Sequence, residues 1–223
     1  LRRAIEELGV IPVINGVVGN NTHRKLNVEE FRGFALADDY APLVFVNGAD
    51  AKSAQIFTLA HELAHIWLGQ SALTDVGLIA RAAQEIESWC DKAAAEFLVP
   101  EQQLKALWRD VRHEASPFEA LARRFKVSPI VIGRRAMDLR LVSREAFFSF
   151  YEEYIARERS QRSDSGGGDF YNNQNTRVGE RFALQVIRAA KEGRVSFAEA
   201  YDLTGLRGGA FQEYAGRLGV NLP

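Results

Sequence analysis

The stretch AQIFTLAHELAHIWLG, residues 54–69, contains two histidines, His61 and His65, on either side of Glu62 and two further residues. Its alanines and leucines favour helix, so we expect one helix here that ends near Gly69. Residues four apart on a helix are offset by about 40°, so both imidazoles leave the same face one turn apart. Two imidazoles in this arrangement can bind one tetrahedral metal ion, and the Glu62 carboxylate can then take a proton from a water on that ion.

A catalytic zinc ion needs a third protein ligand and one open position. The next predicted helix, residues 77–99, offers Glu85, Glu87, Asp91 and Glu96. Residues 85 and 87 lie about 200° apart on a helix, so only one of them can face the metal. Glu87 shares its stripe with small residues that let two helices approach closely, whereas Glu85 shares its stripe with charged ones. We therefore predict Glu87 as the third ligand and Asp91, one turn further, as the acceptor of the second N–H of a ligand histidine.

The composition is that of an ordinary globular protein without a strong charge bias. The 223 residues are 47% hydrophobic and 26% charged, with a net charge of −1. This balance gives no global attraction to nucleic acid or to a membrane surface. No apolar run reaches the roughly 18 residues of a membrane span, and we see no signal peptide. We expect a cytoplasmic protein that does not interact with membranes.

Three bulky or chemically reactive side chains flank the predicted metal ligands. Cys90 is the only cysteine, which excludes an internal disulfide and fits a reducing compartment. We expect it to be a small buried thiol and not a further ligand. Trp67 and Trp89 each stand two positions from a predicted site residue, and we expect both to pack in the core.

The N-terminal half is predicted to be an α+β core. Three β-rich segments, residues 10–18, 31–36 and 43–47, predict a small twisted sheet before the helix that carries the histidines. We predict helices over residues 101–145 and 146–162. The Gly/Ser-rich residues 163–169 indicate a linker. Three short helices are expected after it, over 176–191, 196–203 and 209–218. The predicted domains are a core over 1–100, a helical subdomain over 101–162, and a linker with a helical C-terminal extension over 163–223.

The helical subdomain contains a locally basic segment. Residues 117–142 predict a helix, a short turn at Val127-Ser128 and a second helix, a pattern that resembles a helix-turn-helix. Between residues 101 and 147 there are ten Lys or Arg against six Asp or Glu. Such a face can contact phosphates, but we favour a packing subdomain or one that grips a substrate protein. The basic residues are Arg123, Arg124, Lys126, Arg134, Arg135, Arg140 and Arg144.

Four stretches together resemble the ImmA/IrrE family of zinc metallopeptidases. They are FRGFAL at 31–36, APLVFVN at 41–47, IFTLAHELAH at 56–65 and ESWCDKAAAEFLVP at 87–100. The resemblance covers roughly residues 25–145. The family more often has asparagine where this chain has Asp91, and either residue can accept a hydrogen bond from histidine. The segment from Gly167 to Gly219 is similar to the C-terminal extension of longer members.

The resemblance implies a zincin-like peptidase core in which His61, His65 and Glu87 hold Zn²⁺ and Glu62 is the general base. It also implies a narrow substrate range, because members cut helix-turn-helix transcriptional repressors in stress, mobile-element or defence responses. Two alternatives stay open. One is a DNA-binding regulator with a structural or sensing metal site, and the other is an antitoxin-like scaffold that binds a partner without cutting it.

Overall fold

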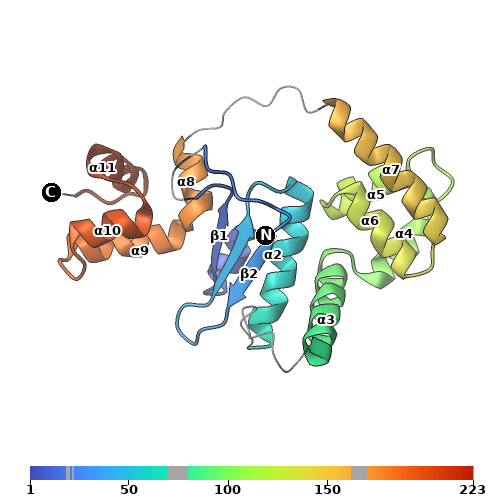
Figure 1. The fold of residues 1–223 in the computed structure, drawn as a ribbon, viewed down its shortest axis with the longest axis horizontal. Helices are drawn as coiled ribbons and strands as arrows, with labels where there is room; N and C mark the ends of the chain where they lie inside the picture. The colour runs from blue at the N-terminus through green and yellow to red at the C-terminus, as the bar shows by residue number, and fades with distance from the viewer. Residues whose placement is uncertain (19–20, 22, 70–79, 162–169, 223) are drawn as a thin grey trace. The chain divides into compact units, whose positions relative to one another are not determined.

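The computed structural model describes residues 1–223 except for 19–20, 22, 70–79, 162–169 and 223 (Figure 1). The chain divides into two compact units, and helix α2 (Lys52–Trp67) runs without a break across the boundary between them. The first unit comprises residues 1–51, 65–74 and 168–223, and the second comprises residues 52–64 and 75–167.

A small mixed sheet forms the centre of the first unit. Its strands are β1 (Ile11–Asn15), β2 (Gly33–Leu36) and β3 (Leu43–Asn47), in the order β1-β3-β2. β1 pairs with β3 in parallel, and β2 pairs with β3 in antiparallel. All three predicted strands are confirmed: β3 has the predicted bounds, and β1 and β2 are shorter than the β-rich segments 10–18 and 31–36. The chain is therefore α+β, with most of its helices after the sheet.

The central position of β3 in the sheet explains why its sequence, LVFVN, is almost entirely apolar. Val44 and Val46 are fully buried on one side of β3. Phe45 lies on the other side and stacks on its partner Phe34, with ring centroids 5.0 Å apart. Because β3 has a strand on each side, β2 and β1 form the two edges of the sheet. Helix α8 (Phe170–Val178) packs against β1, whereas β2 has no second strand partner among the described residues.

Two glycines let the chain leave the sheet in a tight crossing at the ends of β1 and β3. The Gly48 N–H donates to the carbonyl oxygen of Asn15 at 3.0 Å. A Cβ atom on Gly48 would lie 2.8 Å from the backbone nitrogen of Gly16, and one on Gly16 would lie 2.7 Å from the nitrogen of Ala49. The close approach of the two backbones therefore requires glycine at both positions.

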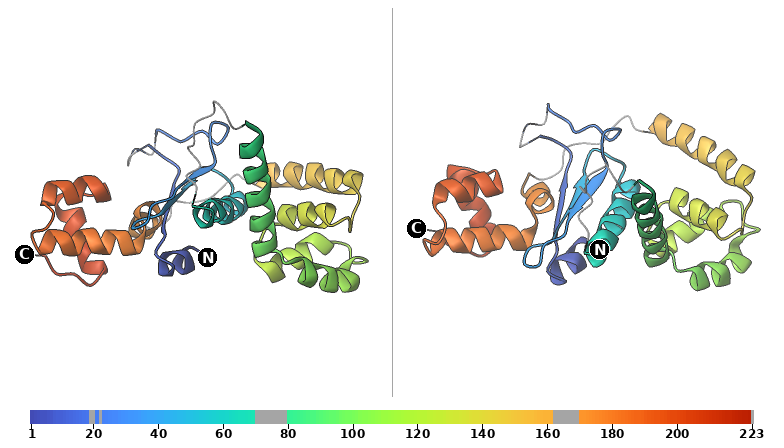
Figure 2. Two further views of the ribbon diagram at one scale, coloured as in Figure 1. Left: turned by 90° about the horizontal axis from the view of Figure 1, so that it is seen from below. Right: turned by 60° about the horizontal axis from the view of Figure 1, so that its bottom comes forward.

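The second unit is helical. It contains part of α2 together with α3 (Ala80–Leu98), α4 (Glu101–Val111), α5 (Pro117–Phe125), α6 (Pro129–Asp138) and α7 (Arg144–Gln161). Helices α4 to α7, green to yellow in Figure 2, gather into one bundle. Its buried core is Val99, Leu104, Trp108, Phe118, Leu121, Ala122, Ile132 and Ala136. The predicted helix over 77–99 is confirmed from Ala80 onward, and its first residues lie outside the described part.

The turn between α5 and α6 falls where the sequence predicted it. Lys126 adopts a left-handed conformation with φ 56°, and the Ser128 hydroxyl caps α6 by accepting from the Val131 N–H at 3.2 Å. One of the predicted surface cations is not at the surface. Arg135 is buried, donates to the Val99 carbonyl oxygen at 3.2 Å and pairs with Glu96. The basic face is therefore smaller than its sequence suggested.

The C-terminal region has one helix more than predicted. Its elements are α8, α9 (Glu180–Lys191), α10 (Phe197–Thr204) and α11 (Gly208–Arg217), and the expected single helix over 176–191 is wrong. Gly179 interrupts it with φ 84°, a conformation that glycine adopts without strain. Three asparagines in FYNNQNTRV, which have low helix propensity, kept α8 from being predicted. The predicted linker at 163–169 lies outside the described residues.

A buried carboxylate connects the two ends of the first unit. Glu6 in α1 (Arg2–Glu7) accepts at Oε1 from Arg2 at 2.9 Å and from the backbone N–H of Glu180 at 3.0 Å. The Arg181 guanidinium donates to the carbonyl oxygen of Glu6, and Arg2 also donates to that of Asn175 at 3.0 Å. These bonds hold α8 and α9 to the N-terminal helix.

Among the described helices, none combines the length and apolar character needed to cross a membrane.

Candidate metal centre

The two histidines lie one turn apart on α2. The helix is anchored by buried apolar residues on the same segment: Leu59, Ala60, Leu63 and Ala64. His65 is buried, and His61 is partly exposed. Gly69, just past the end of the helix, has φ 66° and its N–H donates to the Ile66 carbonyl oxygen at 2.9 Å, so the predicted stop is confirmed.

The neighbouring helix α3 brings Glu87 to these histidines. Glu87 Oε2 lies 3.1 Å from Nε2 of His61. Donor atoms of His61, His65 and Glu87 all lie within 4.8 Å of one another, and this group contains neither Glu85 nor Glu96. Two ligands of a tetrahedral zinc ion at its usual bond lengths are about 3.3 Å apart. Glu87 and His61 already have nearly that separation, and no pair of donor atoms in the group is more than 4.8 Å apart.

Asp91 approaches the opposite nitrogen of the same ring. Its Oδ1 atom lies 2.9 Å from Nδ1 of His61. When Nδ1 carries the proton and donates to Asp91, the lone pair of Nε2 is directed away from Asp91 and towards Glu87. A carboxylate in this position fixes both the tautomer and the orientation of a ligand histidine. The structure thus brings together the four residues that the sequence singled out around a metal.

Glu62 lies inside the protein with an unused acceptor. The residue is 6% exposed, and its Oε2 atom has no hydrogen-bond partner among the described residues. Burial, and then the negative charge of Glu87, raise the pKa of Glu62 from its ordinary 4.5 to about 8. A buried carboxylate without a partner costs free energy, which a nearby cation with its water would lower. The donor set and this orphaned oxygen therefore both fit a divalent metal.

Cys90 is packed beneath these carboxylates as the predicted buried thiol. It is fully buried, and burial together with the charges of Glu87, Glu62 and Asp91 raises its pKa to about 11. The group of possible metal ligands among the described residues does not include Cys90, which is a packing residue of α3.

The two tryptophans beside the site are not core residues, and that prediction is wrong. Trp67 is 56% exposed and Trp89 is 47% exposed. Trp67 is the last residue of α2 and lies beyond the buried part of the helix. Trp89 points to the outer side of α3, next to the exposed Ser88 and one position from the buried Cys90. Proximity in sequence to a ligand did not indicate which side of the helix each indole occupies.

Comparison with known families identifies the part of the chain that carries this centre. A family model for peptidase M78, described as the IrrE N-terminal-like domain, matches residues 21–137, more than half of the chain. The chain belongs to this family. The resemblance inferred from the sequence motifs is thereby confirmed, and M78 membership supports a metallopeptidase in general.

The M78 match runs from the segment before β2 to the end of α6, and it includes every residue of the candidate centre. It leaves out β1, although β1 pairs along the whole of β3. A second family model, described as a domain of unknown function (DUF8813), matches residues 178–217 in the C-terminal helices. A search of curated proteins found no match.

Proposed function

We propose that this M78 member is a zinc-dependent endopeptidase that cuts a regulatory protein, with a helix-turn-helix transcriptional repressor as its substrate. The observation that carries the proposal is the meeting of His61, His65 and Glu87 beside a buried, unpartnered Glu62 carboxylate. Three protein ligands with a free carboxylate at their side make up a catalytic site, whereas a structural zinc site has four protein ligands.

Each residue has a separate role in the proposed reaction. Zinc held by His61, His65 and Glu87 would lower the pKa of a bound water to about 7 and stabilise negative charge on the substrate carbonyl oxygen. Glu62 takes the proton of the attacking water and then delivers it to the leaving amine. Asp91 positions the His61 ring and does not touch the substrate.

An extended substrate segment can be bound by strand addition. The outer edge of β2 has no strand partner among the described residues, so its backbone can pair with a peptide. β3 is paired on both sides and is not available for this role. We therefore assign substrate pairing to Gly33–Leu36. Strand addition relies on main-chain hydrogen bonds, which do not distinguish one substrate protein from another. Substrate selection must therefore depend on other surfaces.

We retain the predicted domains 1–100, 101–162 and 163–223, a zincin-like core, a helix-turn-helix-like subdomain and a C-terminal extension, as part of this proposal. Burial of Arg135 and the ion pair of Arg134 with Asp138 at 3.1 Å reduce the cations available to phosphates. These contacts favour a subdomain that binds protein over one that binds DNA.

The proposal is tested by co-expressing the chain with each helix-turn-helix protein encoded near its gene. Mass spectrometry should find repressor fragments with the wild-type chain and none with Glu62→Gln. Fragments that persist with Glu62→Gln would exclude Glu62 as the base. The wild-type protein and Glu62→Gln could both form stable complexes with a repressor in the presence of zinc and give no fragments. That result would instead support the antitoxin-like scaffold.

A further inference from the structure

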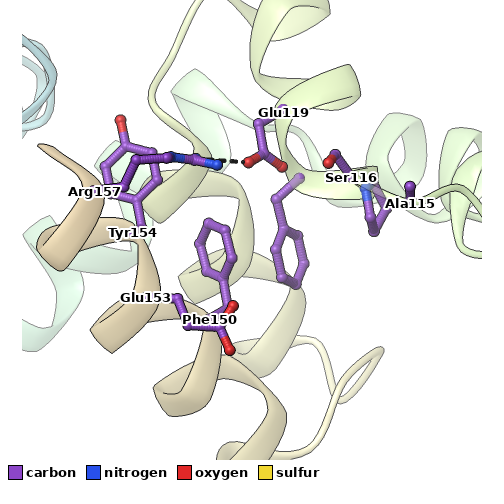
Figure 3. A pocket seen from close by; sticks show the side chains of 9 residues that line it. Ala115, Ser116, Glu119, Phe150, Glu153, Tyr154 and Arg157 are labelled. Carbon is purple, nitrogen blue, oxygen red and sulfur yellow. Dashed lines mark hydrogen bonds and ion pairs between the residues drawn. The ribbon is translucent and has the colours of Figure 1, made fainter. Parts of the chain in front are cut away.

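A pocket in the helical unit lies away from the metal ligands in sequence and combines aromatic walls with two carboxylates. Its volume is about 430 Å³, within the usual range of about 300–1,000 Å³ for ligand pockets. It forms between the start of α5, the residues just before it, and the stretch of α7 from Phe150 to Arg157 (Figure 3). Its principal lining residues are Phe118, Glu119, Phe150, Glu153, Tyr154 and Arg157.

The walls of this pocket are held in place by ring packing. Phe118 and Phe150 meet edge to face with centroids 4.6 Å apart, and Phe118 also stacks on the buried Trp108 at 5.8 Å. Phe150 in turn contacts Tyr154, with centroids 5.7 Å apart. Phe118 belongs to the buried core of the unit, so the wall that it forms is held in place by packing.

An arginine of the chain itself lies against these walls. Arg157 donates from Nη2 to Glu119 Oε1 at 2.9 Å, and its Cζ atom lies 5.4 Å from the centre of the Tyr154 ring. Figure 3 shows this guanidinium reaching across the pocket to Glu119. A carboxylate together with an aromatic face is the environment that guanidinium groups prefer in proteins. The Arg157 side chain is 53% exposed, so this ion pair is in contact with solvent.

A second carboxylate in the pocket is not used by Arg157. Glu153 is exposed and makes no hydrogen bond or ion pair in the part of the chain that the structure describes. The two glutamates outnumber the single arginine, so the pocket has a net negative charge. This charge disfavours phosphate or a carboxylate ligand and favours a second cation.

We propose that this pocket binds an arginine side chain presented by a partner protein. The incoming guanidinium pairs with Glu153 and stacks against the aromatic wall, and it competes with Arg157 for Glu119. Arginine is preferred to lysine because its planar group can bond two acceptors while it stacks on a ring. The inference goes beyond the proposed peptidase reaction and does not depend on cleavage.

The test uses the full chain and the capped tripeptide acetyl-Ala-Arg-Ala-amide, with the Gln and Lys tripeptides as controls. Chemical shifts of the isotope-labelled protein should saturate with the Arg peptide at residues of α5 and α7, and the Gln peptide should bind at least about tenfold more weakly. Shifts that do not saturate, or equal binding of the Gln peptide, would overturn the proposal.

Four variants separate this binding from a purely structural ion pair. Glu153→Gln and Glu119→Gln should each weaken binding of the Arg peptide about tenfold, because each removes a charged acceptor. Glu152→Gln, at the exposed residue next to Glu153 and outside the pocket, should leave the dissociation constant unchanged. Arg157→Gln should tighten binding by vacating Glu119. Weaker binding by Arg157→Gln, or unchanged binding by Glu153→Gln, would contradict the proposed site.

Discussion

Nδ1 of His61 lies 2.9 Å from Oδ1 of Asp91, so a single carboxylate on α3 orients a ring on α2. The other nitrogen of that ring faces Glu87, four residues earlier on α3. Two side chains one turn apart on α3 thus lie next to the two nitrogens of one imidazole ring. The spacing Glu-x-x-x-Asp matters because residues four apart on a helix lie on the same face.

The first prediction concerns this orienting contact. Asp91→Ala should weaken zinc binding about 10–100-fold, because His61 loses the acceptor that fixes its tautomer. Asp91→Asn should stay close to wild type, since its amide oxygen still accepts the Nδ1 proton. Zinc affinity is measured by competition with a chromophoric chelator. Glu85→Ala, at an exposed residue outside the metal group, is the control and should change nothing.

The second prediction separates metal binding from proton transfer. Glu62→Gln should keep a full complement of zinc, because Glu62 is not in the ligand group. Its cleavage rate should fall at least about 10²–10⁴-fold, the usual contribution of a general base. Elemental analysis and a fragment assay are run on the same sample, with His61→Ala as the comparison that should lose the metal. Zinc at wild-type occupancy in His61→Ala would count against the ligand assignment.

The third prediction is a pH dependence of stability in the metal-free protein. Glu62 has a pKa of about 8 when folded against an ordinary 4.5, so between these values the folded chain keeps a proton that the unfolded chain has lost. The free energy of unfolding should therefore fall as pH rises from about 5 to about 8. Below the lower value both states are protonated, and this contribution disappears.

Urea unfolding in the presence of a chelator measures this effect. Glu62→Gln cannot ionise, so its unfolding free energy should lack the component of the decline that comes from Glu62 and should exceed that of wild type most at the alkaline end. Parallel curves for the two chains would show that Glu62 ionises normally in the fold.

The fourth prediction tests the crossing of the two backbones at the ends of β1 and β3. Gly48→Ala should destabilise the chain by about 2 kcal/mol, because its Cβ would lie 2.8 Å from a backbone nitrogen that cannot easily move. Gly216→Ala in α11 is the matched control. No atom from outside its own helical turn lies within 4 Å of the added Cβ, so the substitution should be neutral or stabilising by about 0.5–1 kcal/mol. Chemical denaturation of both variants provides the comparison.

The sequence predicted best where a periodic pattern and a chemical requirement agreed. The H-E-x-x-H spacing placed both imidazoles on one face of α2, and the helical offset of Glu85 from Glu87 selected the carboxylate that the structure brings to His61. The strand β3 was found because it has a continuous apolar run, with Val44 and Val46 buried on one face and Phe45 partly buried on the other.

The sequence predicted poorly where the outcome depended on packing between distant segments. The exposure of Trp67 and Trp89 depends on what covers each helix, and nothing local to either residue encodes that. Glu6 and Glu180 meet across 174 positions of sequence. The aromatic run FFSFYEEY at 147–154 was a usable signal for the pocket on α7, but only a helix was predicted there.

The strand that the family match omits has a practical consequence. A fragment cut to residues 21–137 would lack β1 and so leave one whole side of β3 unpaired. Exposed edges of this kind recruit strands from other molecules. Such a fragment should aggregate and yield misleading assays of peptidase activity, so the minimal working unit begins ahead of the recognised domain.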